Sequence, residues 1–189
     1  MTQPNAVASG LHAAFQLARG RASGLRFVSD DMAGALHSFW AIPVALPPIL
    51  VLRVMAWVES GVPARAGHTL ARDLLVYLAS WLAFAVLSHR MAEGLGRGAL
   101  WPRFIAIWNW CNVVGNILIM VGAIPGFVGA PGMIDQAAQI VVLGWALWLE
   151  WFAVRLSLGV GPLLAVYFVI LDQMVGLGLA ATAALLGGP

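Results

Sequence analysis

Five long apolar runs, separated by short breaks, constrain the fold of this sequence more than any other feature. The runs cover about residues 39–58, 70–88, 104–124, 136–154 and 163–186. Roughly twenty apolar residues in a helix span the hydrocarbon core of a bilayer. The breaks hold residues that end helices, such as Gly61 and Pro63 in the first break and Pro125 in the third. The pattern therefore predicts an all-α, polytopic transmembrane bundle of about five spans.

The composition also indicates that lipid surrounds much of the chain. Hydrophobic residues make up 61% of the chain and charged residues 10%, whereas about a quarter of a soluble domain is charged. A water-soluble core cannot bury this much apolar surface, so lipid must solvate much of it. The ten basic residues are all Arg and do not form the continuous basic face that binds nucleic acid. We expect one integral membrane domain over 1–189, with lipid as a partner and no nucleic acid.

The positions of Arg predict the orientation, because cytoplasmic loops of membrane proteins retain positive charge. With the N-terminus in the cytoplasm, seven Arg fall on the cytoplasmic side: Arg19, Arg21, Arg26, Arg90, Arg97, Arg103 and Arg155. Arg65 and Arg72 fall outside, and Arg53 lies within the first span. We therefore expect a multi-pass protein with a cytoplasmic N-terminus and an external C-terminus.

The N-terminal segment, 1–37, contains a short amphipathic pattern. Apolar residues recur there at helical spacing and precede two arginines: Leu11, Phe15 and Ala18, then Arg19 and Arg21. Such a pattern is typical of a helix that lies on the inner leaflet. The run Ser29-Asp30-Asp31 then predicts an N-cap at the start of the next helix.

Two residue types predict features of the spans themselves. Three prolines in the first span must kink it, since each removes a backbone donor: Pro43, Pro47 and Pro48. Six tryptophans fall toward the cytoplasmic ends of the spans: Trp40, Trp101, Trp108, Trp110, Trp148 and Trp151. We interpret these as an interfacial belt of anchoring rings.

Polar side chains inside the spans are the candidate functional residues. Asn109, Asn112 and Asn116 are three and four residues apart, so they share one helix face. This face either lines a cavity for a polar ligand or forms hydrogen bonds between helices. In both cases the three side chains should turn toward other helices, because a lipid-facing amide would have no partner.

Asp172 lies near the middle of the fifth run. Small residues share its face: Ala165, Gly176, Ala180 and Ala183. Because small residues let a neighbouring helix approach, Asp172 should point into the bundle. It either handles protons or cations, or it is held by a buried partner. We expect Arg53 or the Asn109/Asn112/Asn116 face to supply that partner.

The remaining charged candidates lie in the fourth span. Glu150 and Arg155 fall near its cytoplasmic end, where we expect them at the membrane interface, with Arg155 extending toward water. His37 and His89 also fall near the cytoplasmic side, but depth alone does not indicate a haem site. The sequence contains no HExxH, Gly-Lys phosphate loop, GxSxG or CxxC motif. We expect no metal, no cofactor and no catalytic residue, and an integral-membrane enzyme ranks behind two other functions. Clustered His or acidic residues at one membrane face would favour an enzyme.

Three stretches carry a family resemblance. They are 105–110 (IAIWNW), 150–155 (beginning Glu150-Trp151-Phe152) and Leu171-Asp172. They resemble an uncharacterised family of small five-span bacterial inner-membrane proteins, and the topology is similar to that of Yip-domain membrane proteins. The resemblance implies a bacterial inner-membrane location but brings no activity.

Two functions follow as hypotheses. The first is a non-enzymatic protein that organises or assists membrane partners, which are other membrane proteins or further copies of the chain. The second is a small transporter or proton-coupled permease subunit that uses Asp172 and the Asn face. A water-accessible polar cavity that ends at Asp172 would favour transport, whereas a closed bundle with that carboxyl fully paired would favour the first function.

Overall fold

The computed structural model describes residues 6–186, and all regular structure in that part of the chain is helical. Five helical units are long and apolar enough to cross a bilayer. They are α2–α3 (Met32–Ser38 and Ala41–Ser60), α4 (Ala66–Gly94), α5 (Trp101–Phe127, after the 3-10 turn η2 at Gly98–Leu100), α6 (Gly132–Leu158) and α7 (Pro162–Leu186). The expected five-span bundle is confirmed. The expected external C-terminus, 187–189, lies outside the described residues.

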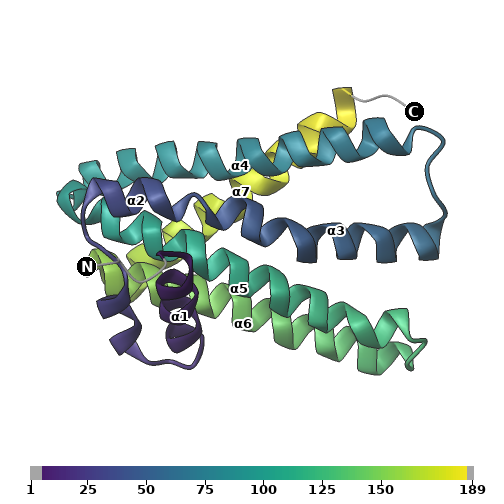
Figure 1. Ribbon diagram of the computed structural model, residues 1–189, viewed down its shortest axis with the longest axis horizontal. Helices are drawn as coiled ribbons and strands as arrows, with labels where there is room; N and C mark the ends of the chain where they lie inside the picture. The colour runs from purple at the N-terminus through teal and green to yellow at the C-terminus, as the bar shows by residue number, and fades with distance from the viewer. Residues whose placement is uncertain (1–5, 187–189) are drawn as a thin grey trace.

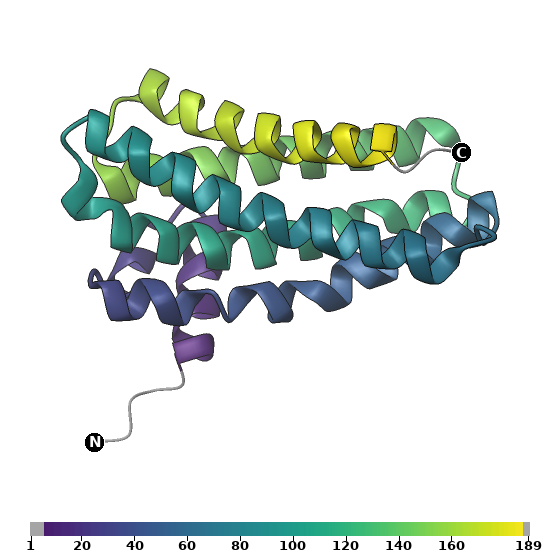
Figure 2. The ribbon, with the colours of Figure 1, turned by 90° about the horizontal axis from the view of Figure 1, so that it is seen from above.

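The long helices run up and down along one axis, with short connections between them (Figure 2). We call the end that contains Met32, Gly94 and Pro162 the proximal end, and the end that contains Ser60 and Leu186 the distal end. The helices extend beyond the expected apolar runs, most clearly α4, which has 29 residues. They extend because polar residues at helix ends remain helical outside the apolar window, so hydropathy alone underestimates helix length.

The central helix is α5. Half of its apolar window is buried within the protein, against 11% to 22% for the other four units. It packs against α6 along most of its length and also contacts α1, α2 and α3. The contact with α6 is close at Gly122, where a Cβ would lie 2.9 Å from Cγ2 of Val142. A side chain at position 122 would therefore push the two helices apart.

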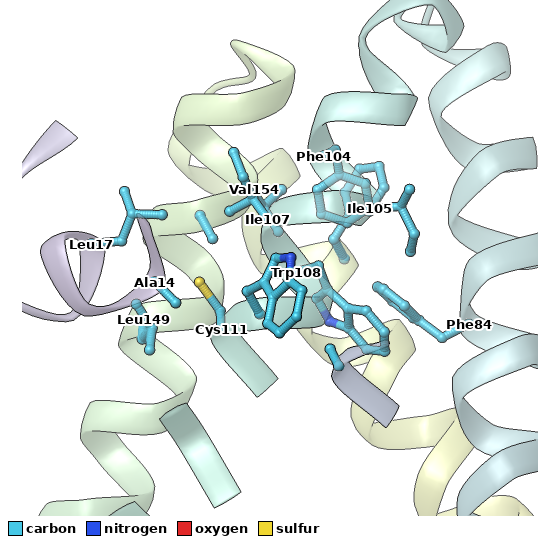
Figure 3. Packing of buried hydrophobic residues seen from close by; sticks show 14 of the residues in the cluster. Ala14, Leu17, Phe84, Phe104, Ile105, Ile107, Trp108, Cys111, Leu149 and Val154 are labelled. Atoms are coloured by element: carbon cyan, nitrogen blue, oxygen red, sulfur yellow. The ribbon is translucent and has the colours of Figure 1, made fainter. Parts of the chain in front are cut away.

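An aromatic cluster joins α4, α5 and α7 in the proximal half of the bundle (Figure 3). The Phe84 ring stacks on Trp108 with centroids 4.3 Å apart, and it contacts Phe104 edge-on at 6.2 Å. Phe104 in turn contacts Phe168 of α7 at 5.5 Å. Edge-to-face and stacked pairs at these distances are favourable beyond the area they bury. This cluster fixes the proximal half as the packed part of the bundle.

The interfacial interpretation of the tryptophans is wrong for two of the six. Trp108 and Trp110 are only 2% and 3% exposed, so they lie in the protein core. The physical reason is the central position of α5, where neighbouring helices cover both rings. Trp40, by contrast, is 63% exposed, so for this ring the anchoring role stays a prediction.

The expected N-terminal helix is present as α1 (Ala6–Ala18), followed by the 3-10 helix η1 (Ala22–Phe27). Figure 1 shows α1 running across the bundle beside α5 and α6. Its buried face is packed on protein: Gly10 lies against Trp110 so closely that a Cβ would overlap the indole. The Trp145 indole of α6 donates a hydrogen bond of 3.1 Å to the Ala18 carbonyl. The helix therefore docks on the bundle through small residues.

The first span is broken rather than only kinked. The helix stops at Ser38 and restarts at Ala41. Pro43 has no N–H for the Phe39 carbonyl, which accepts from the Ile42 N–H at 3.0 Å instead. The predicted N-cap is confirmed at Asp31, whose carboxylate accepts from the Gly34 N–H at 2.7 Å. This bond, followed by one from the Ser29 hydroxyl, holds the pKa of Asp31 below its usual value.

Candidate functional site

Two carboxyl groups meet between α6 and α7. Glu150 lies eight residues before Leu158, the last residue of α6, and Asp172 lies ten residues after Pro162, the first residue of α7. Only residues 159–161 connect the two helices, so they are antiparallel neighbours. The two side chains therefore come to the same level, about 12–15 Å from the proximal ends of their helices. They lie within hydrogen-bonding reach of each other.

Glu150 is held inside the bundle. Its residue is 9% exposed, and the Trp108 indole and the Gln173 amide approach its carboxyl group. Even so, Oε1 of Glu150 and Nε1 of Trp108 are both buried without a well-formed hydrogen bond. A buried carboxyl with unused hydrogen-bonding capacity is unfavourable, and such groups in native proteins call for an explanation.

The carboxyl pair faces a cavity of about 110 Å³ between α5, α6 and α7, which we call the carboxyl cavity. Its polar lining consists of Glu150, Asp172, Gln173, Asn112 and Asn116. The volume exceeds what one water molecule occupies, and the lining offers it several hydrogen-bonding partners. A second space of about 310 Å³, the side cavity, lies between α4, α5 and α7 and is lined by the same two Asn, Asp172 and Gln173.

The three asparagines of α5 fall into two groups. Asn109 is fully buried, and its amide donates to the Ser38 hydroxyl of α2 at 2.7 Å. Asn112 and Asn116 donate to carbonyls of their own helix, those of Trp108 and Asn112, at 3.0 and 2.8 Å. Within the described residues no hydrogen bond engages their Oδ1 atoms. These two side chains line the cavities, so none of the three faces only lipid.

A third cavity extends toward the distal end. This distal cavity, of about 340 Å³, lies between α3, α4 and α5 and is lined by Arg53, Asp73, Tyr77 and Asn116. Nη2 of Arg53 lies 2.6 Å from Oδ2 of Asp73. Tyr77 and Asn116 also line the side cavity. A series of polar side chains therefore leads from the carboxyl pair to the Arg53–Asp73 ion pair.

The structure corrects two expectations about partners. Arg53 does not reach Asp172, because it pairs with Asp73 at the same level of the neighbouring helix. The Asn face lines the cavity beside Asp172 but forms no hydrogen bond with it in the structure. The residue that meets Asp172 is Glu150, which we had expected at the membrane interface and which is instead buried in the bundle.

The sequence contained a signal for the Glu150–Asp172 pair. A three-residue connection forces α6 and α7 to be antiparallel neighbours, so residues at similar distances from it must lie at one level. The same counting brings Arg53, seven residues before Ser60, level with Asp73, seven residues after Ala66. Depth counted within each helix separately does not show this pairing, whereas counting from the shared connection of each hairpin does.

Two carboxyl groups in contact have a restricted set of protonation states. Two adjacent negative charges in a poorly solvated site repel strongly, and a shared proton or a bound cation removes the repulsion. No group of three or more His, Cys, Asp or Glu side chains that could hold a metal ion occurs within 6–186. Because a shared proton removes the repulsion, the pair is suited to bind and release a proton.

Arg155, the last of the candidate residues, lies apart from this site. Its guanidinium carbon stands 4.8 Å from the centroid of the Trp151 ring, one helical turn earlier on α6.

Comparisons with protein-family models, with curated proteins and with solved structures give no match for this chain.

Proposed function

We propose that this protein is a proton-coupled membrane transport protein in which Glu150 and Asp172 bind the coupling proton. One observation carries the proposal: Glu150, a buried carboxyl group with unused hydrogen-bonding capacity, meets Asp172 at a polar cavity. Intramembrane carboxyl groups of this kind are characteristic of proton relays in pumps and transporters. The polar cavity beside Asp172 supports transport over a closed bundle in which that carboxyl would be fully paired.

The proton reaches the pair from the distal end in this proposal. The polar side chains of the three cavities lead in that direction, past Asn116 and Tyr77. On the proximal side, the rings of Phe84, Phe104 and Phe168 pack against one another across α4, α5 and α7. The Arg53–Asp73 pair stands where this route approaches the distal end and opens or closes it as the ion pair breaks or forms.

The orientation completes the proposal. The proximal end carries most of the Arg residues, including Arg90, Arg97 and Arg103, and we place it in the cytoplasm of a bacterial inner membrane. The distal end, with Arg65 and Arg72, then faces the periplasm. The coupling proton enters from the periplasm, the side from which the proton gradient of a bacterial membrane drives uptake.

Proton entry into proteoliposomes tests this function, because in this proposal the carboxyl pair passes its proton across the membrane without a second solute. Vesicles that contain a pH-sensitive dye and carry a negative internal potential, set with valinomycin and potassium, should acidify faster with the wild-type protein than without protein. Glu150→Gln and Asp172→Asn should each reduce the rate to that of protein-free vesicles. Glu59→Gln is the matched control, because Glu59 is an exposed carboxyl near the distal end, and it should leave the rate unchanged.

Two outcomes would contradict the proposal: a wild-type rate equal to that of empty vesicles, or full rates in both cavity variants. In either case the membrane-organising role expected from the sequence becomes the leading hypothesis. That role stays a prediction, as do the family resemblance and the Yip-like topology.

A further inference from the structure

A groove on the outer surface of α6 and α7 is lined almost entirely by apolar side chains. It has a volume of about 410 Å³ and its walls are Leu147, Trp148 and Trp151 of α6 and Val166 and Val169 of α7. Trp148 is itself stacked on Phe152, with ring centroids 5.2 Å apart, so one wall is rigid. A preformed apolar groove between two transmembrane helices fits an extended acyl chain.

Positive charge flanks this groove. Arg155 stands over the Trp151 ring, one turn nearer the proximal end, and its Nε is buried without a hydrogen-bond partner. Gly20 lies beside Trp148, where a Cβ would be 3.7 Å from Cη2 of the indole. The neighbours of Gly20 in the chain are Arg19 and Arg21, which brings two more basic residues to that wall.

No carboxylate neutralises these arginines. The ion pairs between described side chains involve Arg53, Arg72, Arg90 and His89, and none involves Arg19, Arg21 or Arg155. Arg19 instead stands 4.0 Å over the Phe15 ring, and the Arg21 guanidinium donates a hydrogen bond of 3.4 Å to Oε1 of Gln16. Two guanidinium groups held on aromatic rings, with unused donors, match the phosphate oxygens of a lipid headgroup.

We infer that this groove binds a phospholipid with a net negative headgroup, the acyl chain lying against Trp148 and Trp151 and the phosphate held by Arg155 and the Arg19–Arg21 segment. The charge selects an anionic lipid over a zwitterionic one, because three cations would otherwise face an electrically neutral headgroup. Of the groove residues only Leu147 also lines the carboxyl cavity, and the inference does not rest on the proposed transport function.

The lipid would also connect α1 to the rest of the bundle. The walls of the groove belong to α6 and α7, whereas Arg19 and Arg21 lie in the connection that follows α1. A headgroup between them bridges the docked N-terminal helix and the transmembrane helices. We therefore expect α1 to dock more firmly in membranes that contain anionic lipid.

Native mass spectrometry of the detergent-solubilised protein, titrated with phosphatidylglycerol or phosphatidylcholine of equal chain length, tests the inference. The wild-type protein should retain phosphatidylglycerol preferentially. Arg155→Gln should weaken its binding about fivefold, the effect expected of one interfacial cation. Arg65→Gln, which removes a distal Arg, is the matched control and should bind as the wild type does.

A second variant tests the acyl chain separately. Val166→Trp fills the groove from the α7 side without changing a charge, and it should lower binding of both lipids while retaining the preference between them. Addition of glycerol phosphate in excess should not displace the lipid, because the chain contributes to binding. Equal affinity for the two lipids, an unchanged Arg155→Gln variant, or full displacement by glycerol phosphate would each overturn the inference.

Discussion

At the scale of single residues, the bundle places its charged side chains in two different kinds of pair. Arg53 and Asp73 have opposite charges, and their side chains are 39% and 23% exposed, so each remains partly solvated. Glu150 and Asp172 have the same charge type, and Glu150 is only 9% exposed. The first pair is stable while both groups are ionised, whereas the second requires a proton or a cation. This contrast is why we assign function to the second pair.

The Arg53–Asp73 pair gives a stability prediction. Arg53→Gln should lower the free energy of unfolding by about 1 kcal/mol, the value of a partly exposed ion pair, and the melting temperature by about 2–4 °C. Thermal unfolding in detergent measures this. In a double-mutant cycle, Asp73→Asn should show coupling to Arg53→Gln, and Asp172→Asn should show none. Coupling between Arg53 and Asp172 would restore the partner expected from the sequence and contradict the structure.

At the scale of elements, the sequence predicted which helices are present better than it predicted what surrounds their side chains. The apolar runs identified five spans, and the Ser29-Asp30-Asp31 pattern identified the helix start at Asp31, because both depend on local residue types. Hydropathy could not show that α5 is central, so Trp108 and Trp110 were interpreted as interfacial rings. Burial depends on which helices pack together, and that information lies in pairs of elements and not in either one alone.

The docking of α1 gives an element-scale prediction. Gly10→Val should detach α1, because a side chain at this position would overlap the Trp110 indole. Trypsin should then cleave after Arg19 and Arg21 about tenfold faster, as expected when roughly 1.4 kcal/mol of local stability is lost. Ala8→Val, on the exposed side of α1, is the control and should leave the cleavage rate unchanged. Equal cleavage of Gly10→Val and wild type would show that α1 is not held by this contact.

At the scale of the whole molecule, packing is concentrated in the proximal half, and the cavities that adjoin the carboxyl pair extend toward the distal half. The aromatic cluster, α1 and the α2–α5 contact all lie on the proximal side, as Figure 1 shows for α1 and α2. The carboxyl pair stands next to this packed region, beside Trp108. A site of this kind has a rigid support on one side and access on the other, which agrees with a proton entering from the distal end.

The orientation can be tested by labelling with a membrane-impermeant maleimide in whole cells. In a Cys111→Ala background, Val62→Cys and Val128→Cys lie in distal connections and are each at a position that is 69% exposed. Both should be labelled from outside. Gly161→Cys, in the proximal connection between α6 and α7, should be labelled only after permeabilisation. The reverse pattern would place the proximal end outside and refute the Arg-based orientation.

The protonation state of the carboxyl pair tests the central claim most directly. Infrared difference spectra of the reconstituted protein, recorded between low and high pH, report protonated carboxyl groups through their C=O stretching band. The account predicts one such band in the wild type that disappears on deprotonation, is altered or absent in Glu150→Gln and Asp172→Asn, and is unchanged in Glu59→Gln. A wild-type spectrum with no protonated buried carboxyl at any pH, or a band that persists unchanged in both cavity variants, would contradict it.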